Sequence, residues 1–164
     1  MLIVRDGDEE VAWVGLSVAG DALEVAIDAR CFGDPAPLGA PRALDGLWEH
    51  EVVELFVVGA PFSAAAPYLE LEVSPHGHWL ALGFDGYRRR VGLVAVEVVV
   101  QARGERWCAR VRVPLSALPP RPWRVNANAL HGVGEARRYL SATPLGGERP
   151  DFHRVWDFTS EVAS

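Results

Sequence analysis

Glutamates and tryptophans stand at positions in this chain where they could bind a polar ligand. Glu54 lies inside the apolar run VVELFV at positions 52–57, where a carboxylate removed from water needs a partner. Glu70 and Glu72 alternate with apolar residues, so both point to the same face of a predicted strand. An aromatic ring beside such carboxylates would add an apolar platform to a set of hydrogen-bond acceptors. An internal arginine or a capped backbone amide would explain Glu54 equally well.

Glu70 and Glu72 are also a possible acid–base pair, because alternate residues on one strand face lie about 7 Å apart. That spacing suits inverting glycoside hydrolysis, but nothing in the sequence marks either residue as the proton donor. The chain contains no GxSxG, P-loop, GxGxxG or HExxH motif. We therefore predict no catalytic residue, no metal-ligating set and no cofactor, and leave a structural calcium ion and an unrecognised enzymatic activity open.

The second of three predicted β-hairpins carries the polar face. If Ser74 opposes Gly77 across the turn, then Glu72 opposes Trp79. One face would then hold the apolar residues Leu69, Leu71, Val73, Leu80, Leu82 and Phe84, and the other would hold Tyr68, Glu70, Glu72, Trp79, Ala81, Gly83 and Asp85. In this register Trp79 is the aromatic platform between the carboxylates.

The other two hairpins define solvent-exposed and core faces. Closing the first at Gly20-Asp21 pairs Val18 with Leu23 and brings the alternating apolar residues to one face. In the third, over 94–113, the register that unites the valines places Glu97 beside Arg110 as a cross-strand ion pair.

Turn signals recur about every 8–12 residues, which is typical of a sandwich or barrel. Further strands are predicted over 51–58, 123–130 and 138–142, with a short one near Phe158, and a short helix over 115–118. We predict an all-β fold, an antiparallel two-sheet β-sandwich of jelly-roll or immunoglobulin-like type built from consecutive hairpins. Residues 1–164 are within the usual size of one domain.

Charge and composition exclude several classes of partner. The net charge is −6 and all sixteen basic residues are arginine, so nucleic acid is not predicted as a partner. The N-terminus has no secretory leader and no run of about eighteen apolar residues occurs, so we expect a cytoplasmic protein that does not cross a membrane. Cys31 and Cys108 match no zinc spacing and are interpreted as reduced thiols, although a disulfide stays open. The oligomeric state is not predicted.

Residues 47–56, LWEHEVVELF, resemble the W…D/H…ELF strand of the DOMON-like and family-nine carbohydrate-binding-module superfamily, and segments 68–79, 84–88 and 150–153 extend the likeness. The resemblance implies a β-sandwich that binds a small molecule or an oligosaccharide without transforming it. It also implies that Trp48 and Glu54 line the site. A regular strand would separate these two by roughly 20 Å, so a bend before Glu51 is required.

A second aromatic residue near the C-terminus, Phe152 or Trp156, is expected to complete an aromatic clamp. The candidate ligand-binding residues are Trp48, His50, Glu54, Tyr68, Glu70, Glu72, Trp79, His153 and Trp156. One alternative is a haem-binding redox domain with His50 or His153 as an axial ligand. Another is a protein-interaction domain that uses sheet edges or the face of Arg106, Arg110 and Arg112.

Overall fold

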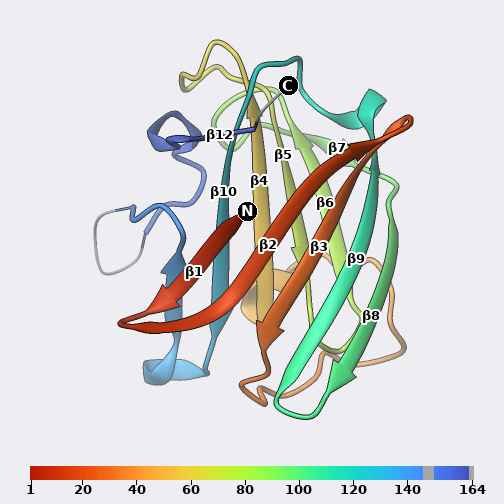
Figure 1. Ribbon diagram of the computed structural model, residues 1–164, viewed down its shortest axis with the longest axis vertical. Helices are drawn as coiled ribbons and strands as arrows, with labels where there is room; N and C mark the ends of the chain where they lie inside the picture. The colour runs from red at the N-terminus through yellow and green to blue at the C-terminus, as the bar shows by residue number, and fades with distance from the viewer. Residues whose placement is uncertain (146–149, 163–164) are drawn as a thin grey trace.

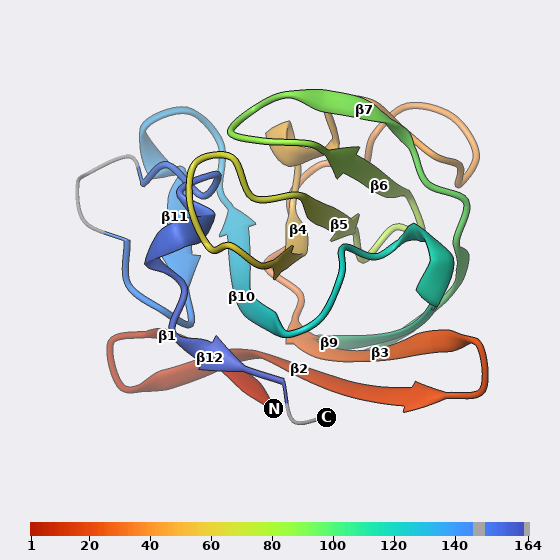
Figure 2. The same cartoon turned by 90° about the horizontal axis from the view of Figure 1, so that it is seen from above.

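Two antiparallel sheets packed face to face form the protein in a computed structural model that describes residues 1–145 and 150–162 (Figures 1 and 2). Sheet A has the order β1-β2-β3-β9-β8 and consists of β1 (Leu2–Asp6), β2 (Glu9–Ala19), β3 (Ala22–Arg30), β8 (Glu97–Arg103) and β9 (Arg106–Pro114). The predicted all-β sandwich is confirmed.

Sheet B lies behind sheet A in Figure 1 and has the order β11-β10-β4-β5-β6-β7, with β12 paired to β10. Its strands are β4 (Val52–Gly59), β5 (Tyr68–Val73), β6 (Trp79–Phe84), β7 (Arg90–Leu93), β10 (Trp123–His131), β11 (Arg138–Ser141) and β12 (Ser160–Glu161). Four 3-10 turns complete the described elements: η1 (Leu47–Glu49), η2 (Leu115–Ala117), η3 (Gly134–Ala136) and η4 (Val155–Asp157). None of these short turns has the length or apolar character of a membrane-spanning helix.

Strand β4 explains why sheet B is covered on both faces. Its alternate residues Val53, Leu55 and Val57 pack into the core between the sheets. The intervening residues Phe56 and Val58 belong to a second apolar cluster on the far face of sheet B. Every residue of β4 is therefore buried, which accounts for a nearly continuous apolar run in the sequence.

Two segments outside the sheets contribute to the second apolar cluster, together with residues of sheet B. Leu47 comes from η1, and Phe152, Val155 and Phe158 come from the C-terminal segment, all packed over the face of sheet B that points away from sheet A. Figure 2 shows η1 and the C-terminal segment on that side. Loops therefore cover the two ends of the far face of sheet B. They do not cover the middle of that face.

The predicted register of the first hairpin is confirmed, and that of the third is wrong by two residues. Val18 pairs with Leu23 as expected. In the third hairpin Glu97 lies opposite Arg112, not Arg110, because the turn closes on the two residues after Arg103. A shift of two residues keeps each side chain on its predicted face, so the core survives the error.

The register of the second hairpin is wrong by one residue, and this changes the site. The Ser74 N–H donates to the His78 carbonyl (2.9 Å) and the Gly77 N–H to the Ser74 carbonyl (3.0 Å), so three residues lie in the turn. Gly77 adopts the left-handed conformation that this longer turn requires (φ 84°). Trp79 therefore pairs with Val73 rather than Glu72 and lies on the opposite face from the glutamates.

Several smaller expectations have clear outcomes. Strands β1 and β7 were not among the predicted strands, whereas β4, β10, β11 and the turn η2 lie where they were expected. Cys31 and Cys108 are free thiols, as expected, and both are half-buried.

We expect Leu55→Ala to destabilise the protein by about 2–5 kcal/mol, because it opens a cavity between the sheets. Leu55 is 1% exposed. The matched control is Leu93→Ala at an edge-strand position that is 63% exposed, which should change the free energy of unfolding by less than about 0.5 kcal/mol. Urea denaturation measures both, and equal losses would contradict the assignment of Leu55 to the core.

Candidate functional site

A row of polar side chains crosses the middle of sheet B. Asn128 of β10 lies opposite Glu54 of β4, which lies opposite Glu72 of β5. The Asn128 amide Nδ2 donates to Glu54 Oε2 at 3.1 Å. Glu70 stands two residues before Glu72 and therefore on the same face. All three carboxylates are buried, and one carboxylate oxygen from each lies within 4.8 Å of the other two.

Burial determines the ionisation of these three glutamates. It raises the pKa of Glu54 from 4.5 to about 7, although the Asn128 hydrogen bond and the charge of Arg137 act in the opposite direction. Burial and the charge of Glu54 raise the pKa of Glu70 to about 8. Burial and the charges of its two neighbours raise the pKa of Glu72 well above its ordinary value. Without a cation, the three carboxyl groups share one or more protons at neutral pH.

An amide and hydroxyl network supports one side of this row. The Ser141 hydroxyl has two acceptors for its one proton, Asn128 Oδ1 at 2.8 Å and the Thr143 carbonyl at 2.7 Å, while the Asn128 amide nitrogen faces Glu54. Asn126 Nδ2 in turn donates to Ser141 Oγ at 2.8 Å. Neither asparagine was predicted as a site residue. Their positions 126 and 128, two apart inside a predicted strand, were the available signal.

His153 and Tyr68 lie on the other side of the row, next to Glu70. The Tyr68 hydroxyl is 2.7 Å from His153 Nδ1, and it accepts a hydrogen bond from the Arg88 backbone N–H. The second imidazole nitrogen, Nε2, lies 4.0 Å from Glu70 Oε1. Burial lowers the pKa of His153 to about 4, so the ring is neutral at pH 7.

The row of polar side chains forms the floor of a cleft. One wall above this floor is the turn η1, which carries Trp48. The turn bends the chain before β4, as the separation of Trp48 and Glu54 along a regular strand required, and brings Trp48 over the same face as Glu54. Arg137 holds the turn in place, because its Nη2 donates to the carbonyls of Trp48 (2.6 Å) and His50 (2.9 Å). The indole remains 42% exposed. Arg137 thus positions an accessible aromatic side chain from 89 residues away.

The opposite wall is the C-terminal segment around residues 150–153, tethered by Asp151. Its Oδ1 accepts from Arg88 Nη2 (2.8 Å) and from the His153 backbone N–H (3.1 Å), and its Oδ2 accepts from the Tyr87 hydroxyl. These contacts attach the C-terminal segment to the turn between β6 and β7. His153 is held over the floor by the same attachment.

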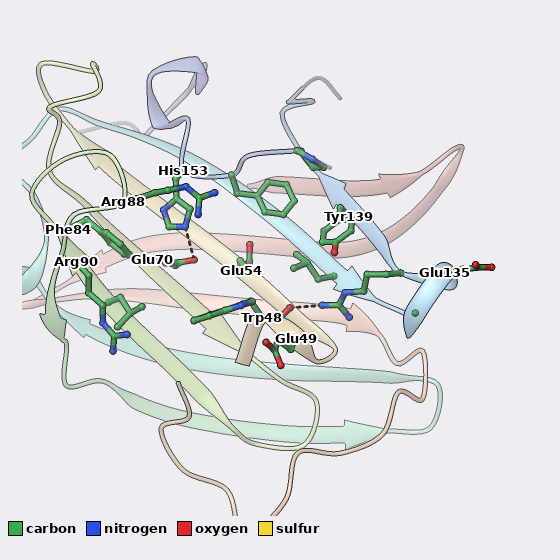
Figure 3. Close-up of a pocket in the computed structure, with 16 residues that line it drawn as sticks. Trp48, Glu49, Glu54, Glu70, Phe84, Arg88, Arg90, Glu135, Tyr139 and His153 are labelled. Carbon is green, nitrogen blue, oxygen red and sulfur yellow. Dashed lines mark hydrogen bonds and ion pairs between the residues drawn. The ribbon is translucent and has the colours of Figure 1, made fainter. Parts of the chain in front are cut away.

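The walls and floor enclose an open cleft of about 1170 Å³ (Figure 3). In Figure 3 Trp48, Glu54, Glu70 and Tyr139 surround one hollow. The complete lining consists of aromatic, aliphatic, acidic and basic residues from both walls: Trp48, Glu49, Glu54, Glu70, Leu82, Phe84, Arg88, Arg90, Leu130, Gly134, Glu135, Arg137, Tyr139, Pro150, Phe152 and His153.

The structure brings together some of the residues predicted for the site and separates others. Trp48, Glu54, Glu70 and His153 line the cleft. Tyr68 and Glu72 lie beneath it, in contact with the residues that line it.

His50, Trp79 and Trp156 do not line the cleft. His50 contributes its backbone carbonyl to Arg137, and the hairpin register turns Trp79 to the other face. Trp156 packs against Tyr87 with ring centroids 5.5 Å apart. Of the two C-terminal aromatics expected in the clamp, Phe152 is the one in the lining. Of the two histidines considered as axial haem ligands, His153 lines the cleft and His50 does not, and haem binding stays a prediction.

Arg88, Arg90, Arg137 and Tyr139 were not predicted as site residues. The run of arginines at 88–90 was visible in the sequence, but its place at the cleft depends on a turn that ends β6. Arg137 lies just before β11 and Tyr139 lies on it. No local sequence pattern distinguishes either residue.

In buffer free of divalent cations, we expect the free energy of unfolding to fall as the pH rises from 6.5 to 8. The folded protein retains protons that the unfolded chain, with carboxyl pKa values near 4.5, has already released. This stabilisation is complete below pH 4.5 and is lost as the pH passes the native values of about 7 and 8. Urea denaturation should show a loss on the order of 1 kcal/mol per pH unit.

His153 does not contribute to this change above pH 6.5. Because its pKa is lowered in the folded protein, it reduces the free energy of unfolding only as the pH falls below 6.5. Glu72→Gln removes one titrating group, so the variant should lose less stability than the wild type across the same window. If the wild type had the same free energy of unfolding at pH 6.5 and at pH 8, the inference that the three glutamates share protons would be refuted.

Similarity searches support the sandwich fold. No family model matches the chain. The solved structure of an inferred carbohydrate-binding protein from Bacteroides uniformis superposes with a TM-score of 0.72 at 21% identity, covering 96% of this chain and 82% of that one. A family-nine carbohydrate-binding module from Caldicellulosiruptor kristjanssonii in complex with cellotriose gives a TM-score of 0.52 at 17% identity, covering 79% and 63%. The expected likeness to DOMON proteins stays a prediction.

Sequence relatives cover nearly the whole chain. The UPF0462 protein C4orf33 of Homo sapiens is 34% identical over 161 residues, which is 92% of this chain and 79% of the human protein. Its homologue in Mus musculus is 33% identical over 156 residues, covering 89% and 79%. Identity at this level over most of both sequences shows common descent, and the chain belongs to the UPF0462 family.

Proposed function

We propose that the cleft on the far face of sheet B binds a carbohydrate. The observation that supports this most directly is the exposed indole of Trp48 next to the carboxylates of Glu54 and Glu70 in one cleft. A sugar ring presents an apolar C–H face and a rim of hydroxyl groups. A binding site for it needs an aromatic surface and polar groups at its edge, and this cleft has both.

The polar groups can serve hydroxyls as donors and as acceptors. Glu54 and Glu70 have pKa values near neutrality, so each can accept a hydroxyl proton when ionised or donate one when protonated. Arg88 and Arg90 line the same cleft and donate from their guanidinium groups. A ligand hydroxyl that reaches the floor therefore finds a partner for either role.

The size of the cleft favours a ligand longer than one sugar ring. Its volume of about 1170 Å³ exceeds the roughly 300–1000 Å³ that is typical of sites for small ligands. Two structural neighbours were solved with cellotriose and with glucose, which supports a saccharide ligand for a cleft on the same fold.

We expect wild-type protein to bind an oligosaccharide in isothermal titration calorimetry, with cellotriose as the first probe and a glycan array to extend the search. Trp48→Ala should weaken binding at least about tenfold, or ~1.4 kcal/mol, because the ligand loses its aromatic surface. The matched control is Trp13→Ala. Trp13 lies on β2 of sheet A and is 43% exposed, against 42% for Trp48.

The two tryptophan variants separate site binding from general effects. Loss of affinity in Trp48→Ala alone supports the cleft. Equal affinity in both variants, or no saccharide bound by the wild type across the array, would overturn the proposal.

A further inference from the structure

The three buried glutamates form a cluster that fits a metal ion as well as shared protons. One oxygen each of Glu54, Glu70 and Glu72 lies within 4.8 Å of the others. Two oxygens bound to one Ca²⁺ at about 2.3–2.6 Å can be separated by up to roughly 5 Å, so one ion can contact all three carboxylates. Carboxylate oxygens are the ligands that hard divalent cations prefer.

Glu72 points to a missing ligand most clearly. Its side chain is fully buried, and neither of its carboxylate oxygens has a hydrogen-bond partner among the described residues. Both features are unusual together, because a buried carboxylate without a partner costs several kcal/mol if it is ionised. Its position opposite Glu54 and two residues from Glu70 directs it into the cluster.

The nearby arginines act on Glu54 and Glu70 through their charge, but among the described residues none of them forms an ion pair with Glu72. Arg88 pairs with Asp151 at 2.8 Å, and Arg90 pairs with Asp45 at 2.9 Å. The third cation, Arg137, donates to backbone carbonyls and lies 3.7 Å from Asp34. Each guanidinium therefore already has an acceptor of its own, and Glu72 is left for a ligand that comes from solution.

We propose that Glu54, Glu70 and Glu72 bind one divalent cation, with Ca²⁺ the best match in size and ligand type, at the floor of the cleft. Glu54 and Glu70 also line the cleft, so the ion is reached from solvent through it. Water completes the coordination shell on that side. A sugar that occupies the cleft would replace some of this water with its hydroxyl oxygens, and this last step rests on the proposed carbohydrate binding.

Metal binding is tested without any sugar. Protein is first treated with EDTA, then the thermal midpoint is measured with CaCl₂, MgCl₂ or MnCl₂, and the affinity is measured by calorimetry. We expect Ca²⁺ to raise the midpoint and Glu72→Gln to weaken Ca²⁺ binding at least about tenfold. Glu97→Gln, on β8 of sheet A, is the matched control and should respond to Ca²⁺ like the wild type.

Terbium luminescence gives a second readout that does not depend on stability. Tb³⁺ in the Ca²⁺ site would be sensitised by Tyr68 and Trp48, and its emission should fall when Ca²⁺ is added in excess. The Glu72→Gln variant should show little of this emission while remaining folded, because an amide replaces a buried carboxyl group of the same size. No midpoint shift with any of the three cations, or equal Ca²⁺ affinity in Glu72→Gln and in Glu97→Gln, would overturn the cation site and leave shared protons as the explanation of the cluster.

The link to carbohydrate binding is measured separately. Saccharide affinity that rises when Ca²⁺ is added, in the wild type but not in Glu72→Gln, supports direct contact between the ion and the sugar. Ca²⁺ binding with unchanged saccharide affinity overturns that contact and leaves the cation site standing. Ca²⁺ binding with no saccharide bound overturns the proposed function alone.

Discussion

Three glutamates occupy positions that a sheet covered on both faces otherwise gives to apolar residues. Their neighbours on β4 and β5, Phe56 and Tyr68, pack against the C-terminal segment. Glu54 and Glu70 also have little exposed surface, but they line the cleft between the covering segments, whereas Glu72 is buried beneath it. Removing carboxylates from water is costly, and burial accordingly raises the pKa values of all three. The placement of charge in the sheet thus coincides with the place where the molecule is open.

Much of this arrangement follows from local patterns that a single sequence displays. The apolar run around Glu54 predicts a strand with both faces buried and one polar interruption, and β4 has that form. The distance between Trp48 and Glu54 along a regular strand required a bend, and η1 provides it. Alternation along consecutive hairpins was sufficient to predict two antiparallel sheets. Each of these inferences depends on residues within about ten positions of one another.

The parts that escaped prediction depend on turn length or on distant contacts. A turn of two or three residues is compatible with Pro75, yet the choice decides the face of Trp79, because a shift of one residue reverses a strand. The walls depend on Arg137 reaching η1 across 89 residues and on Asp151 reaching Arg88 across 63. Hydrogen bonds over such separations leave no periodic signal in one sequence. Asn128 was overlooked because its partner, Glu54, lies on a strand distant in the chain.

The division between floor and walls also bears on how such a protein can diversify. The floor belongs to the central strands of sheet B, where a changed side chain disturbs packing on both faces. The walls are short connections attached largely through single residues, Arg137 on one side and Asp151 on the other. Insertions in those connections would alter the width of the opening without altering the sheet beneath. Homologues can therefore retain one chemistry at the base and acquire different ligand preferences through the loops.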